Sequence, residues 1–100
     1  MIVLMGPTPL SGIGQVMLKY CKLLNTRNYI QYGQEVSLRQ LRGDILFAFV
    51  LPIQSHIQAV QALQGRFRRV CAMTVCETDR VHRSYGLLAR ETKWEWFTPS

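Results

Sequence analysis

Runs of apolar residues separated by glycine and proline predict an alternation of strands and helices along this chain. Met1–Met5 is an unbroken apolar run that stops at Gly6, which is typical of a strand buried on both faces of a sheet. A turn over Pro9–Gln15 follows, and apolar residues then recur at helical spacing over Val16–Leu24. The predicted inner face of this helix consists of Val16, Tyr20 and Leu24, with Met17 and Cys21 beside them.

The alternation continues to the end of the chain. The pattern predicts further strands over Asn28–Tyr32, Ile45–Leu51, Val70–Val75 and Trp94–Thr98. It predicts helices over Val36–Arg42, from Pro52 to Gly65 with an apolar stripe at Ile53, Ile57, Val60 and Leu63, and around Val81, Tyr85 and Leu88. Gly43 and Gly65 are expected to end the first two of these helices. Thr78 or Asp79 is expected to cap the third.

Strands that alternate with helices over short connections predict one α/β unit with a doubly wound, mostly parallel, Rossmann-like sheet. The run Ile45–Leu51 lacks polar alternation, so we expect it at the centre of the sheet. A chain of 100 residues suffices for one core, and residues 1–100 are assigned to a single unit. Because Pro99 and Ser100 are typical of a helix start, we expect this unit to be incomplete and to form the first part of a larger domain.

The composition is that of a folded domain. Apolar residues make up 48% of the chain and charged residues 18%, which excludes a disordered tail. The longest apolar run, Ile45–Leu51, is far shorter than the roughly 20 residues that a membrane-spanning helix needs. The sequence also opens without the pattern of a secretory leader. We therefore expect a cytoplasmic protein without a transmembrane segment.

The cysteines and histidines offer little metal or redox chemistry. Cys21, Cys71 and Cys76 form no C-x-x-C pair, and neither histidine stands at ligand spacing from them. We therefore expect reduced thiols and predict no metal and no other cofactor. His56 falls on the polar side of its predicted helix, where we expect it to be solvated. Cys76 and His82 lack the orienting third group that a nucleophilic site needs.

The net charge of +6 rests mainly on arginine, which supplies nine of the twelve basic residues. Arg66, Arg68 and Arg69 form one cluster in the sequence, and Arg80 and Arg83 form another. A surface of this charge attracts phosphate groups, whether on nucleic acid, on a nucleotide or on an acidic partner. Charge alone does not choose among these partners.

Candidate binding chemistry stands at the carboxyl ends of two predicted strands, where doubly wound sheets bind their ligands. After the first strand, Gly12 and Gly14 permit close approach of the backbone, and the helix that follows offers free N–H groups to an anion; a plain tight turn is the alternative. After the fourth strand, Glu77 and Asp79 are suited to acid–base work or to binding sugar hydroxyls, with helix capping as the alternative. The candidate residues are Gly12, Ile13, Gly14, Glu77 and Asp79.

Two of these stretches together resemble a known family. Ser11–Leu18 resembles the GG-I-G-x-V turn of glycosyltransferase family four, a GT-B family of retaining sugar transferases. Cys76–Tyr85 is similar to the W-E-T-D-R-x-P-x-x-W segment of one branch of that family, and Thr98–Ser100 looks like the V-P-S that follows there. The chain departs from this pattern at Cys76, where the branch has tryptophan, and at His82, where it has proline.

The resemblance implies the first part of the amino-terminal, acceptor-side domain of such an enzyme. The backbone of Gly12 and Gly14 would then contact the diphosphate of a nucleotide-sugar. Glu77 and Asp79 would border the same cleft, and Glu77 would orient the acceptor. Many relatives carry a catalytic histidine after the fourth strand, and Thr74–Glu77 contains none, so no catalytic residue is assigned. The donor-binding domain with its E-x7-E carboxylates does not occur in these residues, so we expect the chain to be inactive alone.

Two classes of partner follow from these observations. As a transferase portion, the chain would bind a nucleotide-sugar and a sugar or lipid-linked acceptor, and it would need a partner domain or self-association to cover its sheet. The alternative is a non-catalytic basic module that docks on nucleic acid or on an assembly partner. Its basic face would comprise Arg66, Arg68, Arg69, Arg80 and Arg83.

Overall fold

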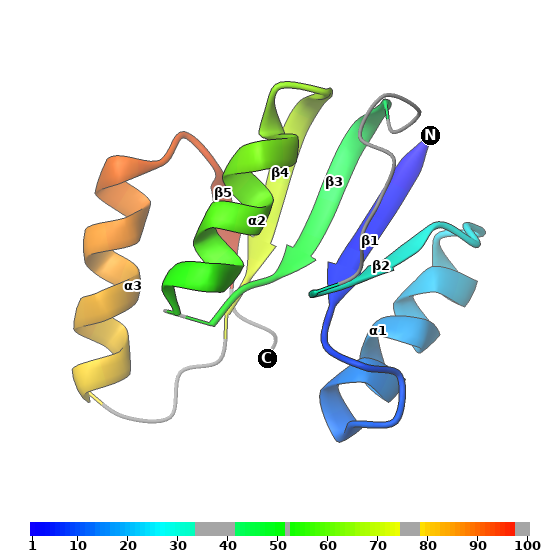
Figure 1. Cartoon of the computed structure of the whole chain (residues 1–100), viewed down its shortest axis with the longest axis horizontal. Coiled ribbons are helices and arrows are strands. Elements are labelled where there is room, and N and C mark those ends of the chain that lie inside the picture. Colours follow the sequence, from blue (N-terminus) through cyan, green and yellow to red (C-terminus); the bar gives the residue numbers. More distant parts are fainter. Residues whose placement is uncertain (34–41, 52, 75–78, 98–100) are drawn as a thin grey trace.

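The computed structural model describes residues 1–33, 42–51, 53–74 and 79–97, which form strands and helices in strict alternation except between β2 and β3 (Figure 1). The strands are β1 (Ile2–Gly6), β2 (Tyr29–Gln31), β3 (Gly43–Phe49), β4 (Phe67–Met73) and β5 (Glu95–Phe97). The helices are α1 (Gly12–Leu23), α2 (Gln54–Gln64) and α3 (Asp79–Glu91). The predicted α/β class is therefore confirmed.

The five strands form one parallel sheet in the order β2-β1-β3-β4-β5. The central position belongs to β3, where Leu46 pairs in register with Val3 of β1 and Val70 of β4. This confirms the position that unbroken hydrophobicity predicts for this strand, because a central parallel strand is covered on both faces. From β1 the chain winds first to β2 and later in the opposite direction to β3, β4 and β5.

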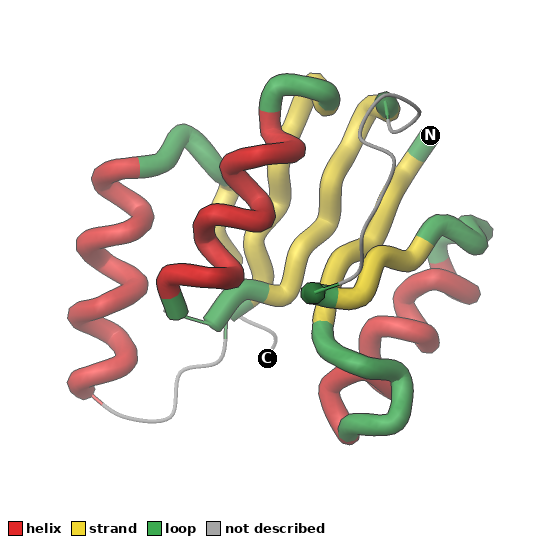
Figure 2. Tube along the Cα trace, in the orientation of Figure 1, coloured by secondary structure: helices red, strands yellow, loops and turns green. Residues whose placement is uncertain are grey.

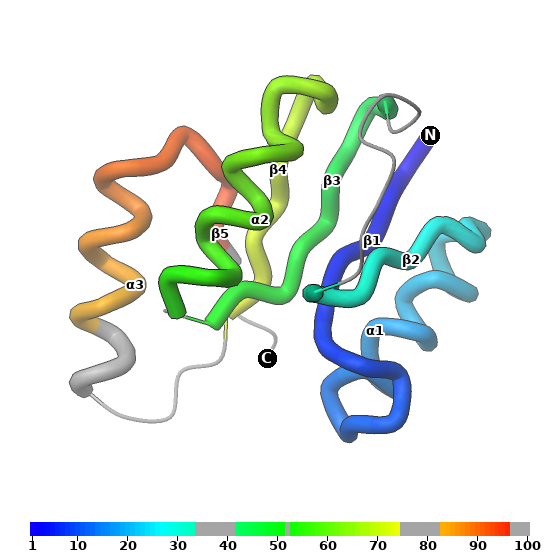
Figure 3. The backbone as a smooth tube through the Cα atoms, viewed as in Figure 1, coloured from blue at the N-terminus to red at the C-terminus, as the bar shows by residue number. Residues whose placement is uncertain are grey.

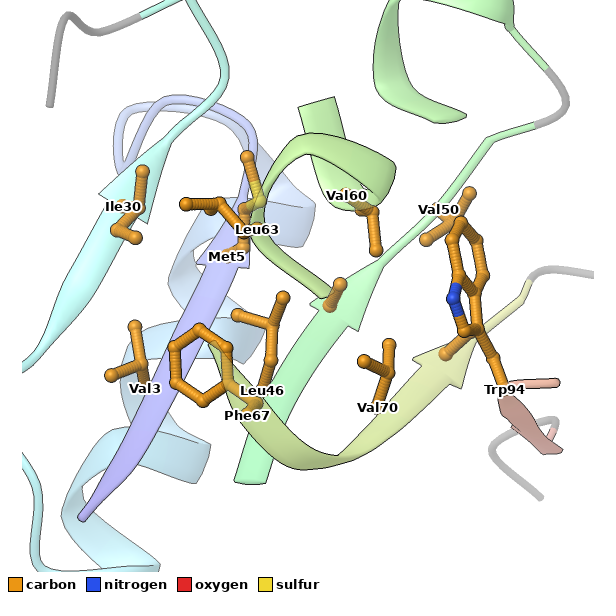
Figure 4. Packing of buried hydrophobic residues seen from close by; sticks show 12 residues of the cluster. Val3, Met5, Ile30, Leu46, Val50, Val60, Leu63, Phe67, Val70 and Trp94 are labelled. Atoms are coloured by element: carbon orange, nitrogen blue, oxygen red, sulfur yellow. The ribbon is translucent and has the colours of Figure 1, made fainter. Parts of the chain in front are cut away.

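Because the chain winds in two directions from β1, its helices cover both faces of the sheet, as Figure 2 shows. On one face, Val60 and Leu63 of α2 pack with strand residues in a cluster that extends to Trp94 (Figure 4). On the same face, the Tyr85 hydroxyl of α3 donates to the carbonyl of Val50 at 2.8 Å. On the other face, α1 packs onto a second cluster through Met17 and Cys21. The doubly wound architecture follows from these two clusters.

The first helix begins earlier than the sequence pattern predicts. Its amino-terminal cap is Ser11, so Gly12–Gly14 forms the first helical turn rather than a preceding loop. Figure 3 shows the short connection between β1 and α1. The predicted inner face is also wrong in part, because Val16 is 44% and Leu24 38% exposed, whereas Met17 is fully buried. The early start adds a turn to the helix, and the residues that pack on the sheet, Met17 and Cys21, are one helical turn apart.

Other boundaries also differ from the prediction. Gly43 begins β3 instead of ending a helix, and Phe67 begins β4 three residues before the predicted start at Val70. These two residues pair in register. Because the Phe67 ring is buried, the polar residues that follow it also belong to the strand. Gly65 ends α2 as predicted. The predicted helix over residues 36–42 falls almost wholly outside the described residues, as do the positions of Pro52 and Thr78.

Candidate functional site

The start of α1 lies at the carboxyl end of β1, and β3 is the neighbouring strand in the sheet. Connections from these two strands leave in opposite directions along the sheet. In open α/β sheets, ligands bind outside the carboxyl ends of the strands where the strand order reverses. The predicted candidate residues Gly12, Ile13 and Gly14 are therefore at the position where this fold binds ligands.

The loop before α1 is held by side-chain hydrogen bonds. Ser11 Oγ donates to the Thr8 carbonyl at 2.8 Å and accepts from the Gly14 amide at 2.9 Å. The Tyr29 hydroxyl donates to the Pro7 carbonyl at 2.5 Å. Gln15 Nε2 donates to the carbonyl of Pro9. These bonds fix the direction of the first helical turn, so its backbone N–H groups are held in place before any ligand binds.

The two glycines of this turn have different roles. A Cβ atom on Gly14 would stand 2.0 Å from the Thr8 carbonyl oxygen and 2.8 Å from Pro9 Cα, so only glycine lets the loop and helix approach this closely. A Cβ atom on Gly12 would meet nothing within 4 Å, so this residue faces open space. Gly14 is therefore structural, and Gly12 is the residue at which a ligand can approach the backbone.

The amides at this helix start have an electrostatic bias toward anions. Gly14 N–H is satisfied by Ser11, whereas the N–H groups of Gly12 and Ile13 have no partner among the described residues. The Ile13 side chain packs against the cluster beneath α1, so its contribution to a ligand is limited to its backbone. The first turn of α1 contains no acidic residue that would cancel the positive end of the helix dipole.

The second helix start at this edge has the same character. The cap residue of α2, Ile53, makes no side-chain cap hydrogen bond, and the first turn of α2 again contains no acidic residue. Because β1 and β3 are neighbours, the starts of α1 and α2 lie at adjacent strand ends on opposite faces of the sheet. Two positive helix ends therefore converge on one sheet edge.

The carboxylates predicted to share this edge are described only in part. Asp79 is the first residue of α3, which starts at the same carboxyl-end edge of the sheet. Glu77 and Cys76 lie outside the described residues. Thr74, directly after β4, is a buried polar residue at this edge.

The surroundings of His56 differ from those that the sequence pattern predicts. Its ring stacks on Tyr32 with a centroid distance of 3.9 Å and an interplanar angle of 1°, so it is not simply solvated. Its Nδ1 atom is buried and has no hydrogen-bond partner in the part of the chain that the structure describes. The Tyr32 hydroxyl donates to the Phe49 carbonyl at 2.7 Å, which fixes this pair at the end of β3. A contact between residues so far apart in sequence leaves no periodic signal.

We expect His56 to make the fold sensitive to mild acid. Desolvation by burial lowers the pKa of His56 below its ordinary value of 6.5. The unfolded chain therefore binds a proton more readily than the folded chain, and the free energy of unfolding falls as the pH drops below 6.5. Urea unfolding at pH about 7.5 and about 5.5 measures this difference. This difference in the free energy of unfolding should be smaller in His56→Phe and unchanged in His82→Gln. A difference in His56→Phe as large as that in the parent chain would contradict the assignment.

The five arginines of the predicted basic face do not form one surface. Arg66, Arg68 and Arg69 lie at the amino-terminal end of β4, whereas Arg80 and Arg83 lie in the first part of α3, at the opposite edge of the sheet. The strand β4 carries the chain from one edge of the sheet to the other, so arginines before and after it lie at opposite edges. The single basic face is therefore corrected to two groups at opposite edges.

Metal chemistry and membrane crossing receive no support from the described parts of the chain. No group of three or more His, Cys, Asp or Glu side chains there is arranged to hold a metal ion. None of the helices in those parts is both long and apolar enough to span a membrane. Comparisons with known protein families, with curated proteins and with solved structures give no match to this chain.

Proposed function

We propose that the chain is the acceptor-side portion of a retaining glycosyltransferase, which moves a sugar from a nucleotide-sugar donor to a hydroxyl acceptor. One observation carries the proposal: the unpartnered amides of Gly12 and Ile13 stand at the sheet edge where doubly wound folds bind phosphates. The resemblance of Ser11–Leu18 and Cys76–Tyr85 to glycosyltransferase family four supplies the reaction class.

In this proposal, the start of α1 receives the diphosphate of the donor. The amides of Gly12 and Ile13 donate to a phosphate oxygen, and the positive helix end stabilises the negative charge that develops on the leaving diphosphate. Gly14 keeps these amides in place through its contact with Thr8. Preorganised donors are effective because they need not reorient during the reaction.

In this proposal, the acceptor lies at the same edge of the sheet, beside the residues that follow β4. Glu77 and Asp79 orient the acceptor hydroxyl by accepting hydrogen bonds from it. The donor-binding lobe comes from a partner domain or a partner chain, and the chain alone does not transfer sugar. Binding of the diphosphate group is therefore the property to test first.

The variant Gly12→Pro tests the role of the Gly12 amide without removing the helix. Gly12 is the first helical residue, where the fixed φ of proline suits the helix and the missing N–H removes one donor. Ser11 has φ −81° and ψ 160°, an extended conformation that is suitable before proline. The matched control is Gly12→Ala, which keeps the N–H group.

We expect Gly12→Pro to weaken binding of a uridine or guanosine diphosphate sugar by about tenfold, the cost of one hydrogen bond to a charged group. Gly12→Ala should keep the affinity within about twofold. An NMR titration of ¹⁵N-labelled chain measures both and should shift the Gly12 and Ile13 amide signals. Equal affinity of the two variants, or shifts confined to other residues, would argue against the proposed site.

A further inference from the structure

Basic side chains gather at the amino-terminal edge of β3, β4 and β5, opposite to the edge that carries the start of α1. Six cations belong to the starts of these strands and the end of α3: Arg42, Arg66, Arg68, Arg69, Arg90 and Lys93. Three carboxylates lie at the same edge: Asp44, Glu91 and Glu95. We call this set of nine residues the amino-edge surface.

The carboxylates of the amino-edge surface are mostly engaged. Asp44 Oδ2 accepts from the amino-terminal ammonium of Met1 at 2.6 Å, and Arg68 Nε lies 3.8 Å from Asp44 Oδ1. Glu95 accepts from Nε and Nη2 of Arg69 at 2.7–3.0 Å. The ion pairs of the described residues include none of Arg42, Arg66, Arg90 and Lys93. The surface therefore keeps a positive excess that is not neutralised internally.

A pocket of about 530 Å³ opens within this surface, between the end of α2, the start of β4 and the connection from α3 to β5. Trp94 and Val70 contribute apolar lining, Gln61 and Gln64 contribute amides, and Arg68 and Lys93 are among its cations. Its volume lies within the roughly 300–1,000 Å³ that is usual for pockets that bind organic ligands.

The polar groups of the pocket are suited to the edge of a planar ligand. Trp94 Nε1 donates to Gln64 Oε1 at 2.8 Å, which orients the amide and leaves its two N–H donors for another partner. Gln61 is exposed and presents both a donor and an acceptor. Paired donors and acceptors of this kind recognise the hydrogen-bonding edge of a nucleobase.

We propose that the amino-edge surface binds single-stranded nucleic acid, with its phosphates on the basic side chains and one unpaired base in the pocket. Of the five cations outside the Arg69–Glu95 ion pair, four are arginine, whose planar fork binds phosphate oxygens in pairs. Cations distributed over three strand ends match a chain of phosphates, whereas one isolated phosphate engages only a few of them. This site extends beyond sugar transfer, because it occupies the opposite edge of the sheet.

A pair of charge-matched variants tests the proposal. Arg68→Gln/Lys93→Gln removes two exposed cations that line the pocket. Lys19→Gln/Arg83→Gln removes two exposed cations from α1 and α3 away from this surface and leaves the same net charge. Fluorescence anisotropy with a labelled thymidine 20-mer, over a series of salt concentrations, measures the affinity of each full-length chain. Thermal unfolding shows that each variant is folded.

We expect the first variant to bind at least about tenfold more weakly at low salt and to lower the log–log salt slope by about 1.4, the value for two lost phosphate contacts on a single strand. The control variant should remain within about twofold of the parent chain. A strand of the same length without bases should bind the parent chain at least about fivefold more weakly, because it cannot fill the pocket.

Three results would overturn the proposal. One is equal loss of affinity in both variants, which indicates attraction to net charge alone. Another is displacement of the 20-mer by polyglutamate as effectively as by unlabelled 20-mer at equal charge, which indicates an acidic protein as the partner. The third is absence of binding to the 20-mer at about 50 mM salt, where phosphate contacts are strong.

Discussion

Gly14→Ala should destabilise the fold by about 3 kcal/mol, because the added methyl group overlaps backbone rather than a movable side chain. The new Cβ atom would stand 2.0 Å from Thr8 O, 2.7 Å from Thr8 C and 2.8 Å from Pro9 Cα. The loop cannot withdraw freely, since Ser11 Oγ binds the Thr8 carbonyl. Thermal unfolding should show a decrease in Tm of roughly 12–24 °C for a domain of this size.

Gly12→Ala is the control for this prediction, two residues earlier in the same helical turn. Its Cβ atom would meet nothing within 4 Å, so we expect a gain of about 0.5 kcal/mol from the reduced freedom of the unfolded chain. A similar loss of stability in both variants would contradict the prediction, because a Cβ atom overlaps Thr8 only at Gly14.

Leu46→Ala should be the other severe substitution. Leu46 is fully buried in the central strand β3, between Val3 of β1 and Val70 of β4. Truncation removes apolar contacts and leaves a cavity, which costs about 2–5 kcal/mol. Urea unfolding should show a lower midpoint with an unchanged slope if the fold stays cooperative.

Leu87→Ala makes the same chemical change on the surface of α3, where the residue is 60% exposed. We expect an effect within about 0.5 kcal/mol. A loss at Leu87 as large as the loss at Leu46 would mean that this part of α3 is covered, and that the face assigned to solvent is an interface.

The elements that the sequence predicts well are those with unbroken or strictly periodic hydrophobicity. The central strand β3 and the amphipathic part of α2 are of this kind, because one rule of burial governs each of them. The place of Gly12 and Gly14 in the fold is also predictable, since their position after a buried strand already implies the carboxyl end of a parallel strand.

The features that sequence reasoning misses depend on contacts between distant residues. The early start of β4 depends on the pairing of Phe67 with Gly43. The stack of His56 on Tyr32 depends on how α2 crosses the sheet. The separation of Arg66 from Arg83 depends on the return direction of α3, which no local pattern contains. Local periodicity predicts elements, whereas these contacts require the topology.

The two outermost strands, β2 and β5, are each described as only three residues long, while the central β3 has seven. Edge strands this short leave few unpaired backbone N–H and C=O groups with which a strand from another molecule can pair. Amyloid-like extension through the sheet borders is therefore disfavoured, and copies of this chain that associate should do so through helices or through side chains on the sheet surface.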